Sequence, residues 1–156
     1  MIRLLIALGV LASTTTWAIG ADFALGCFAR VYDRAHLAKH PDQIVTGVKL
    51  HILRRQVRDP PYAYDFALRV RMRGRNEPLS TVGLCKTEPP GVKCIVECDG
   101  GEVRIVPRAD HAMMYLDRIR MAEDLPNGGE ELTGGKDDRV FHLDRVADRV
   151  CAGVKP

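Results

Sequence analysis

The stretch Phe-Ala-Leu-Arg-Val-Arg-Met-Arg at residues 66–73 decides the fold class. Apolar side chains at the even positions alternate with an alanine and three arginines at the odd positions. A period of two residues is typical of a β-strand that buries one face. Residues 48–52, Val-Lys-Leu-His-Ile, repeat the pattern. The sequence therefore predicts two half-buried strands whose outer faces carry basic side chains.

Further strands are predicted on both sides of this pair, at residues 79–85, 92–98, 102–107 and 139–143. Proline- and glycine-rich turns separate them, and the connections are too short for the crossovers that parallel strands need. We expect a mainly β fold, an antiparallel meander that closes into a small barrel or a sandwich of about seven to eight strands. Residues 112–122 fit neither period cleanly, and residues 124–136 are the longest expected loop.

Two helices are expected to flank the sheet. Residues 27–39 place Cys27, Val31, Ala35 and Ala38 on one helical face and stop before Pro41. Residues 144–151 form the second, shorter helix, with Asp144 as its N-cap.

The apolar pattern also predicts a register for the hairpin after residue 73. Pairing Met72 with Ser80 sets Val70 opposite Val82 and aligns the apolar faces of both strands. The same alternation turns Cys85 outward while Cys94 points inward. A bond between these two cysteines would then need a bulge.

The N-terminal residues predict export. A basic start at Arg3 precedes an apolar run and a small-residue stretch, which together are typical of a cleaved signal peptide over residues 1–20. The remaining residues 21–156 are expected to form a single β-rich domain in the periplasm or outside the cell, with no membrane span. Cys27 follows Leu-Gly as in a lipid-attachment box, but Ala24 and Asp22 do not fit that motif.

The chain has five cysteines, which are expected to be oxidised in such a compartment. Cys85 and Cys94 flank a turn, and Cys27 and Cys151 lie near the two ends. This pairing leaves Cys98 free. The alternative joins Cys98 to Cys151.

The candidate binding residues are Lys49, His51, Arg69, Arg71 and Arg73, which alternation aims along one sheet face. Arginine's planar guanidinium suits phosphate and carboxylate groups. The face could hold an anionic lipid of the envelope, a polyanion or an acidic partner. Alternatively, its charges only keep an outer sheet face solvated.

Other functional signals are weak. His36 and His40 have the spacing of a helical metal pair and share a helix edge with Tyr32, but a capping or core role is favoured. No hydrolase, phosphate-loop or zinc-protease motif occurs in the sequence, so we expect neither catalysis nor a metal or cofactor. A net charge of +3, with acids interspersed, does not predict nucleic-acid binding.

The segments Cys-Phe-Ala-Arg-Val-Tyr-Asp at residues 27–33 and His-Leu-Ala-Lys-His-Pro-Asp-Gln-Ile-Val at residues 36–45 resemble those of exported bacterial proteins of unknown function. The resemblance implies export and no particular chemistry. Together with the strand pattern and the basic face, it leads us to expect a non-enzymatic protein that binds a small or anionic ligand or an envelope partner. The alternatives are a secreted inhibitor of another enzyme, for which an exposed loop at residues 124–136 would be suitable, and a small thiol or hydrolytic enzyme.

Overall fold

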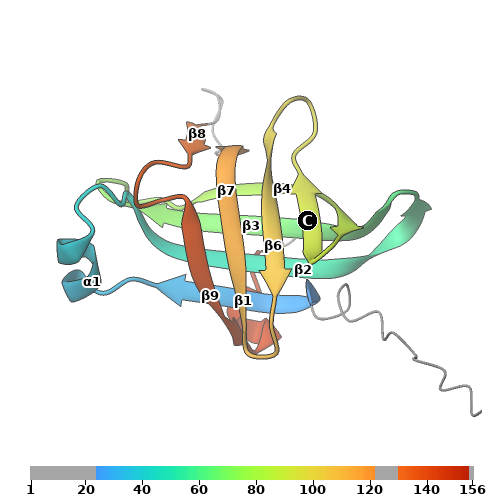
Figure 1. Ribbon diagram of the computed structural model, residues 1–156, viewed down its shortest axis with the longest axis horizontal. Coiled ribbons are helices and arrows are strands. Elements are labelled where there is room, and N and C mark those ends of the chain that lie inside the picture. The colour runs from blue at the N-terminus through green and yellow to red at the C-terminus, as the bar shows by residue number, and fades with distance from the viewer. Residues whose placement is uncertain (1–23, 122–129, 155–156) are drawn as a thin grey trace, which may run out of the picture.

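The computed structural model describes residues 24–121 and 130–154 (Figure 1). Its strands are β1 Gly26–Val31, β2 Val45–Asp59, β3 Tyr62–Met72, β4 Leu79–Glu88, β5 Gly91–Ile95, β6 Gly101–Pro107, β7 His111–Met121, β8 Glu130–Thr133 and β9 Val140–Val146. Two short helices, α1 Arg34–Lys39 and η2 Asp148–Cys151, complete the described chain. Neither has the length or the apolar content to cross a membrane. The expected signal peptide lies outside the described residues, as do residues 124–129 of the expected loop. Residues 130–133 of that loop form the strand β8 instead, because they pair with the end of β7.

Eight antiparallel strands close into a barrel. From β1 to β7 each strand pairs with the next, β7 also pairs with β9, and β9 returns to β1. The closing contact aligns Cys27 with Val146 and Ala29 with Asp144. The short β8 continues the sheet along the far end of β7. The predicted mainly β, antiparallel fold is confirmed, and of the two architectures left open the barrel is the correct one.

Large side chains fill the barrel. The inward residues of β2 and β3 are those of the two alternating stretches, and Leu50, Ile52, Phe66 and Leu68 are fully buried. Three phenylalanines, Phe28, Phe66 and Phe141, are among the largest buried side chains. Eight strands enclose a space just wide enough for side chains. The interior is therefore a packed core, and binding sites must be sought on the outer surface.

Both predicted helices are wrong. Residues 26–31 form β1, because their backbone hydrogen-bonds to β2 on one side and to β9 on the other. Only the end of the predicted N-terminal helix is helical, as α1, which begins after Asp33 accepts a hydrogen bond from the His36 amide at 2.7 Å. At the C-terminus, Asp144 belongs to β9, and only the four residues of η2 turn helically.

The predicted register of β3 with β4 is wrong by three residues. Val70 pairs with Leu79, and Ala67 pairs with Val82. The inner face of β4 consequently carries Leu79, Thr81, Gly83 and Cys85, while Val82 points outward and is 48% exposed. Position 83 requires glycine, because a Cβ on Gly83 would lie 2.7 Å from Phe66 Cε1 and would collide with the carbonyl oxygen of Ile95.

Two disulfides confirm the first of the predicted cysteine pairings. Cys85 and Cys94 are direct partners across β4 and β5, and no bulge is needed because both point inward. Cys27 of β1 is bonded to Cys151 of η2, 124 residues later in the chain. Cys98 is free and exposed, so the alternative bond to Cys151 is wrong. Two disulfides indicate an oxidising, extracytoplasmic environment.

Candidate functional site

The outer face of β1, β2 and β3 brings most of the predicted basic residues together. Lys49 pairs with Arg69 across β2 and β3, and Gly47 pairs with Arg71 one row further along. On the other side Ala29 of β1 pairs with Lys49. Strand alternation points these side chains away from the core, as the sequence predicts.

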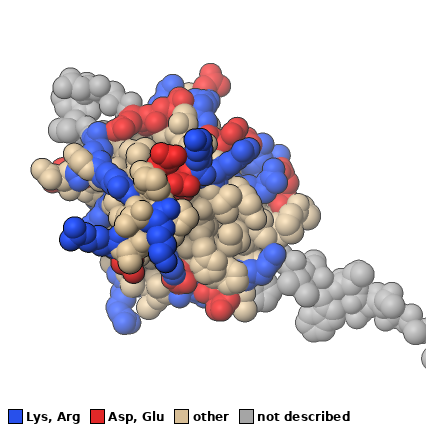
Figure 2. All heavy atoms as spheres, turned by 60° about the vertical axis from the view of Figure 1, so that its left-hand side comes forward, with Lys and Arg blue, Asp and Glu red and all other residues tan. Residues whose placement is uncertain are grey.

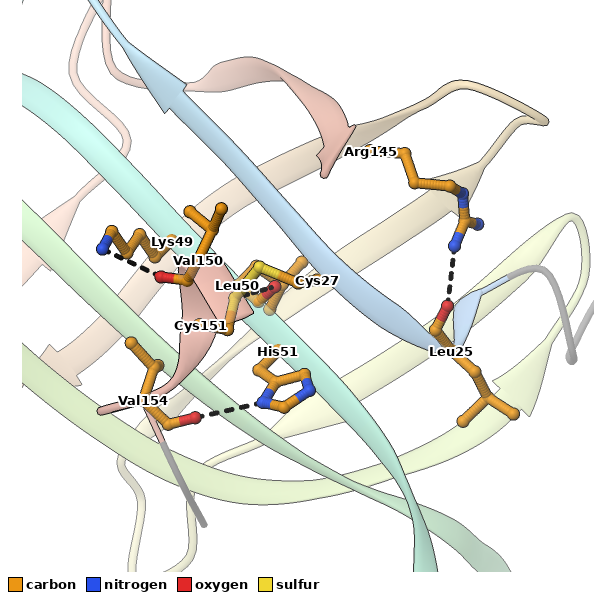
Figure 3. The surroundings of a disulfide bond; sticks show 9 residues. All are labelled: Leu25, Cys27, Lys49, Leu50, His51, Arg145, Val150, Cys151 and Val154. Atoms are coloured by element: carbon orange, nitrogen blue, oxygen red, sulfur yellow. Dashed lines mark hydrogen bonds between the residues drawn. A yellow bond between two sulfur atoms is a disulfide. The ribbon is translucent and has the colours of Figure 1, made fainter. Parts of the chain in front are cut away.

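Residues 148–154, which comprise η2 and the three residues after it, cover the middle of this face (Figure 3). We call them the C-terminal turn. Lys49 Nζ donates a hydrogen bond of 2.9 Å to the Val150 carbonyl, and His51 Nδ1 lies 3.2 Å from the Val154 carbonyl oxygen. The bond between Cys27 and Cys151 fixes the turn to β1. Beneath the turn lies a small apolar cluster, which contains Cys27, Ala67, Cys151 and Val154.

A groove of about 330 Å³ lies beside the turn. We call it the basic groove. Its charged lining residues are Arg30, Lys49, Arg69 and Arg71, and its apolar lining residues include Val31, Pro78 and Val150. The groove therefore combines four cationic side chains with an apolar wall, of which Val31 is 75% exposed.

The charges of the basic groove are only partly compensated. Arg30 donates a hydrogen bond of 2.8 Å to Asp144, which raises the pKa of its guanidinium. Within residues 24–121 and 130–154, the side chains of Arg69 and Arg71 have no hydrogen-bond or ion-pair partner. The Nε atom of Arg69 is buried as well. A buried donor without an acceptor costs about 1 to 3 kcal/mol. The candidate contacts for a ligand are the guanidinium groups of Arg69 and Arg71, because both residues line the groove without a partner.

Two of the predicted binding residues serve other roles. His51 lies under the C-terminal turn, where its Nε2 atom is buried without a partner among the described residues. Arg73 leaves the face at the end of β3 and donates to the carbonyls of Leu37 and His40, which attaches α1 to the barrel. Arg30 was missed because the sequence pattern assigns its segment to a helix. Its place in the groove follows from the strand β1.

The predicted histidine pair on α1 forms a ring stack. The His36 ring lies 4.7 Å from that of Tyr32 and 4.4 Å from that of His40. His36 Nε2 lies 3.0 Å from Oε1 of the buried Gln43, which itself donates to the Val45 carbonyl. Among the described residues no group of three histidines, cysteines or acids could hold a metal ion. The stack thus joins α1 to the start of β2.

Ionisation of Tyr32 makes the stability of the folded protein depend on pH. Burial raises the pKa of its hydroxyl to about 12, and the opposing effect of Arg30 is smaller. An unfolded tyrosine releases its proton near pH 10, so between about pH 10 and 12 the unfolded chain binds fewer protons. Stability should therefore fall as the pH rises through this window. Tyr32→Phe should flatten that fall in urea titrations and remove the absorbance step near pH 12. An unchanged slope and an unchanged step in the variant would contradict this.

A second pair of stacked histidines lies on β7 and β9. The rings of His111 and His142 are 4.4 Å apart, and His111 Nδ1 lies 2.7 Å from Asp110. This contact lowers the pKa of the Asp110 carboxyl. His142 Nδ1 lies 3.7 Å from Asp144, the partner of Arg30. No sequence pattern indicates this pair, because its members are 31 residues apart and only the pairing of β7 with β9 brings them together.

The exposed thiol of Cys98 lies in the turn that joins β5 to β6. In the described chain the histidine rings contact Tyr32 or one another, and their nitrogens lie near Gln43, Asp110, Asp137, Asp144 and Val154. A cysteine–histidine pair, as a thiol enzyme requires, is not formed among these residues. The thiol-enzyme alternative therefore gains no support from the geometry.

Charge elsewhere on the surface is mixed. On the face shown in Figure 2, Lys and Arg side chains lie among Asp and Glu side chains and between uncharged areas.

Comparison of the chain with protein-family models, with curated proteins and with solved structures finds no match.

Proposed function

We propose that the chain is an exported, non-enzymatic protein that binds an anionic group in the basic groove. The observation that carries this proposal is that Arg69 and Arg71 line one groove with Lys49 and have no hydrogen-bond or ion-pair partner in the described part of the chain. A phosphate or carboxylate would supply the acceptor that Arg69 lacks, since a guanidinium binds two oxygens of such a group at once.

The shape of the groove favours an anion that carries an apolar part. Its volume of about 330 Å³ is at the small end of ligand sites. Val31, Pro78 and Val150 offer hydrocarbon contacts next to the cationic side chains. An amphiphile of the cell envelope, with a phosphate or carboxylate head, has this combination.

The C-terminal turn prepares the groove for binding. Val150 lines the groove, and its carbonyl holds the Lys49 ammonium in place. Because Cys151 is bonded to β1, this wall is ordered before any ligand arrives. A preformed wall lowers the entropy lost on binding.

The proposal is tested with protein purified from its own cell envelope. Native mass spectrometry should show the chain with an added, extractable anionic molecule. The double variant Arg69→Gln, Arg71→Gln should bind it at least about 100-fold more weakly, because each charge-assisted hydrogen bond contributes about 1.5 to 3 kcal/mol and the variant loses at least two.

The matched control is Arg120→Gln, which removes an exposed arginine of β7 outside the groove. It should retain the ligand as the wild type does. Wild-type protein that carries no added mass, or a double variant that retains the ligand fully, would refute the proposed function.

A further inference from the structure

The hairpin of β2 and β3 extends beyond the barrel (Figure 1). The pairing of β2 with β1 ends at Ile52, and the pairing of β3 with β4 ends at Tyr64. Residues 54–63 therefore lie past the wall that the neighbouring strands form. We call these residues the arm. Barrel closure does not require it, since closure runs through strands that pair elsewhere.

Ion pairs order the arm. Arg55 lies 2.5 Å from Asp65 and 3.7 Å from Asp59, so one guanidinium joins the tip of the arm to its base. Pro60 and Pro61 form the connection between the strands and restrict its backbone. An ordered projection loses little entropy when it enters a partner.

The arm and its base expose apolar surface next to positive charge. Val57 is 66% exposed, and Leu53 and Val82 at the base are 37% and 48% exposed. A hollow of about 330 Å³ is lined by the arm itself, and a second of about 440 Å³ by Arg55, Val82, Leu84 and their neighbours. Arg55 lines both hollows, so the two lie next to each other at this residue. Val82 and Leu84 point outward from β4 and therefore do not contribute to the core.

The charge of the arm selects the partner. It contains three arginines and one aspartate, and Arg55 is compensated by Asp59 and Asp65. Arg58 has no side-chain partner in the described part of the chain. Arginine and tyrosine are enriched where protein interfaces are strongest, and Tyr62 lies in the same hollow as Arg58.

We infer that the arm, with Val82 and Leu84 at its base, docks into a carboxylate-lined cleft of a partner protein. The apolar side chains would fill the cleft while Arg58 pairs with an acidic group at its edge. This goes beyond anion binding in the basic groove, which lies near Gly47 and Lys49 at the opposite end of β2.

The first experiment identifies the partner in place. A photoreactive amino acid replaces Val57 in the full chain, expressed in its own host, and a control places it at Val140, which is 44% exposed on β9. Irradiation should join the arm, and not Val140, to one protein. Crosslinks to lipid, to a second copy of this chain, or equally from both positions would overturn the inference.

The second experiment tests the chemistry with the purified partner. Val57→Asp and Arg58→Glu should each weaken binding about tenfold or more, while Val140→Asp and Arg120→Glu should change it less than twofold. Unchanged circular dichroism would show that the variants fold. Binding that Arg58→Glu leaves intact would overturn the inference. Variants of Arg69 and Arg71 should not affect it, so failure here is distinguishable from failure of the groove.

Discussion

Replacement of both Cys27 and Cys151 with alanine should lower the free energy of unfolding by about 2 to 5 kcal/mol. The bond connects residues 124 positions apart, so its loss frees nearly the whole described chain in the unfolded state. It also releases the C-terminal turn from β1, along with the contacts of Lys49 and His51. Urea unfolding monitored by circular dichroism measures the change.

Two comparisons separate this effect from the loss of any cysteine. Cys98→Ser alters an exposed, unbonded residue and should shift stability by less than about 0.5 kcal/mol. The double alanine variant should in addition bind less anion, because Val150 no longer lines the groove. A double variant as stable as the wild type would refute the structural role assigned to this disulfide.

Phe66→Ala should cost about 3 to 5 kcal/mol of stability. Phe66 is fully buried and is paired with Gly83, above whose missing side chain its ring lies. Truncation leaves a cavity that neither strand can fill, since both are held in the closed ladder. The same urea assay measures this loss.

Val140→Ala is the control, because this residue of β9 is 44% exposed and should change stability by less than about 0.5 kcal/mol. A cost for Phe66→Ala no larger than that of Val140→Ala would mean that the barrel interior is not a tightly packed core.

Local alternation was sufficient to predict the central strands, and long-range contacts decided what it could not. The stretches at residues 48–52 and 66–72 fold as strands with the predicted faces. The helical spacing of Cys27, Val31, Ala35 and Ala38 was misleading, because β1 is a strand only through its pairing with β2 and the distant β9. No local signal reports a partner more than a hundred residues away.

The prediction of the register between β3 and β4 failed for a different reason. The apolar residues Val82 and Leu84 suggest the inner face, yet Gly83 takes that position and leaves room for Phe66. Phe66 of β3 occupies the space that the missing side chain of Gly83 leaves on β4. This fit becomes visible only when both strands are considered together.

The candidate site shows the same division between local and distant information. Strand alternation correctly brought together Lys49, Arg69 and Arg71. It could not show that His51 would be covered by the C-terminal turn or that Arg73 would bind α1. Arg30 lines the groove because it belongs to β1, a strand that the sequence pattern did not predict.

The central claim is that Arg69 and Arg71 bind an anion, and a nuclear magnetic resonance titration tests it most directly. The full chain, labelled at the arginine side chains, is titrated with hexyl phosphate at constant ionic strength. We predict saturable shifts of the Nε–H signals of Arg69 and Arg71, and no saturable shift for Arg120. No saturation at Arg69 and Arg71, or the same response at all three arginines, would contradict the claim.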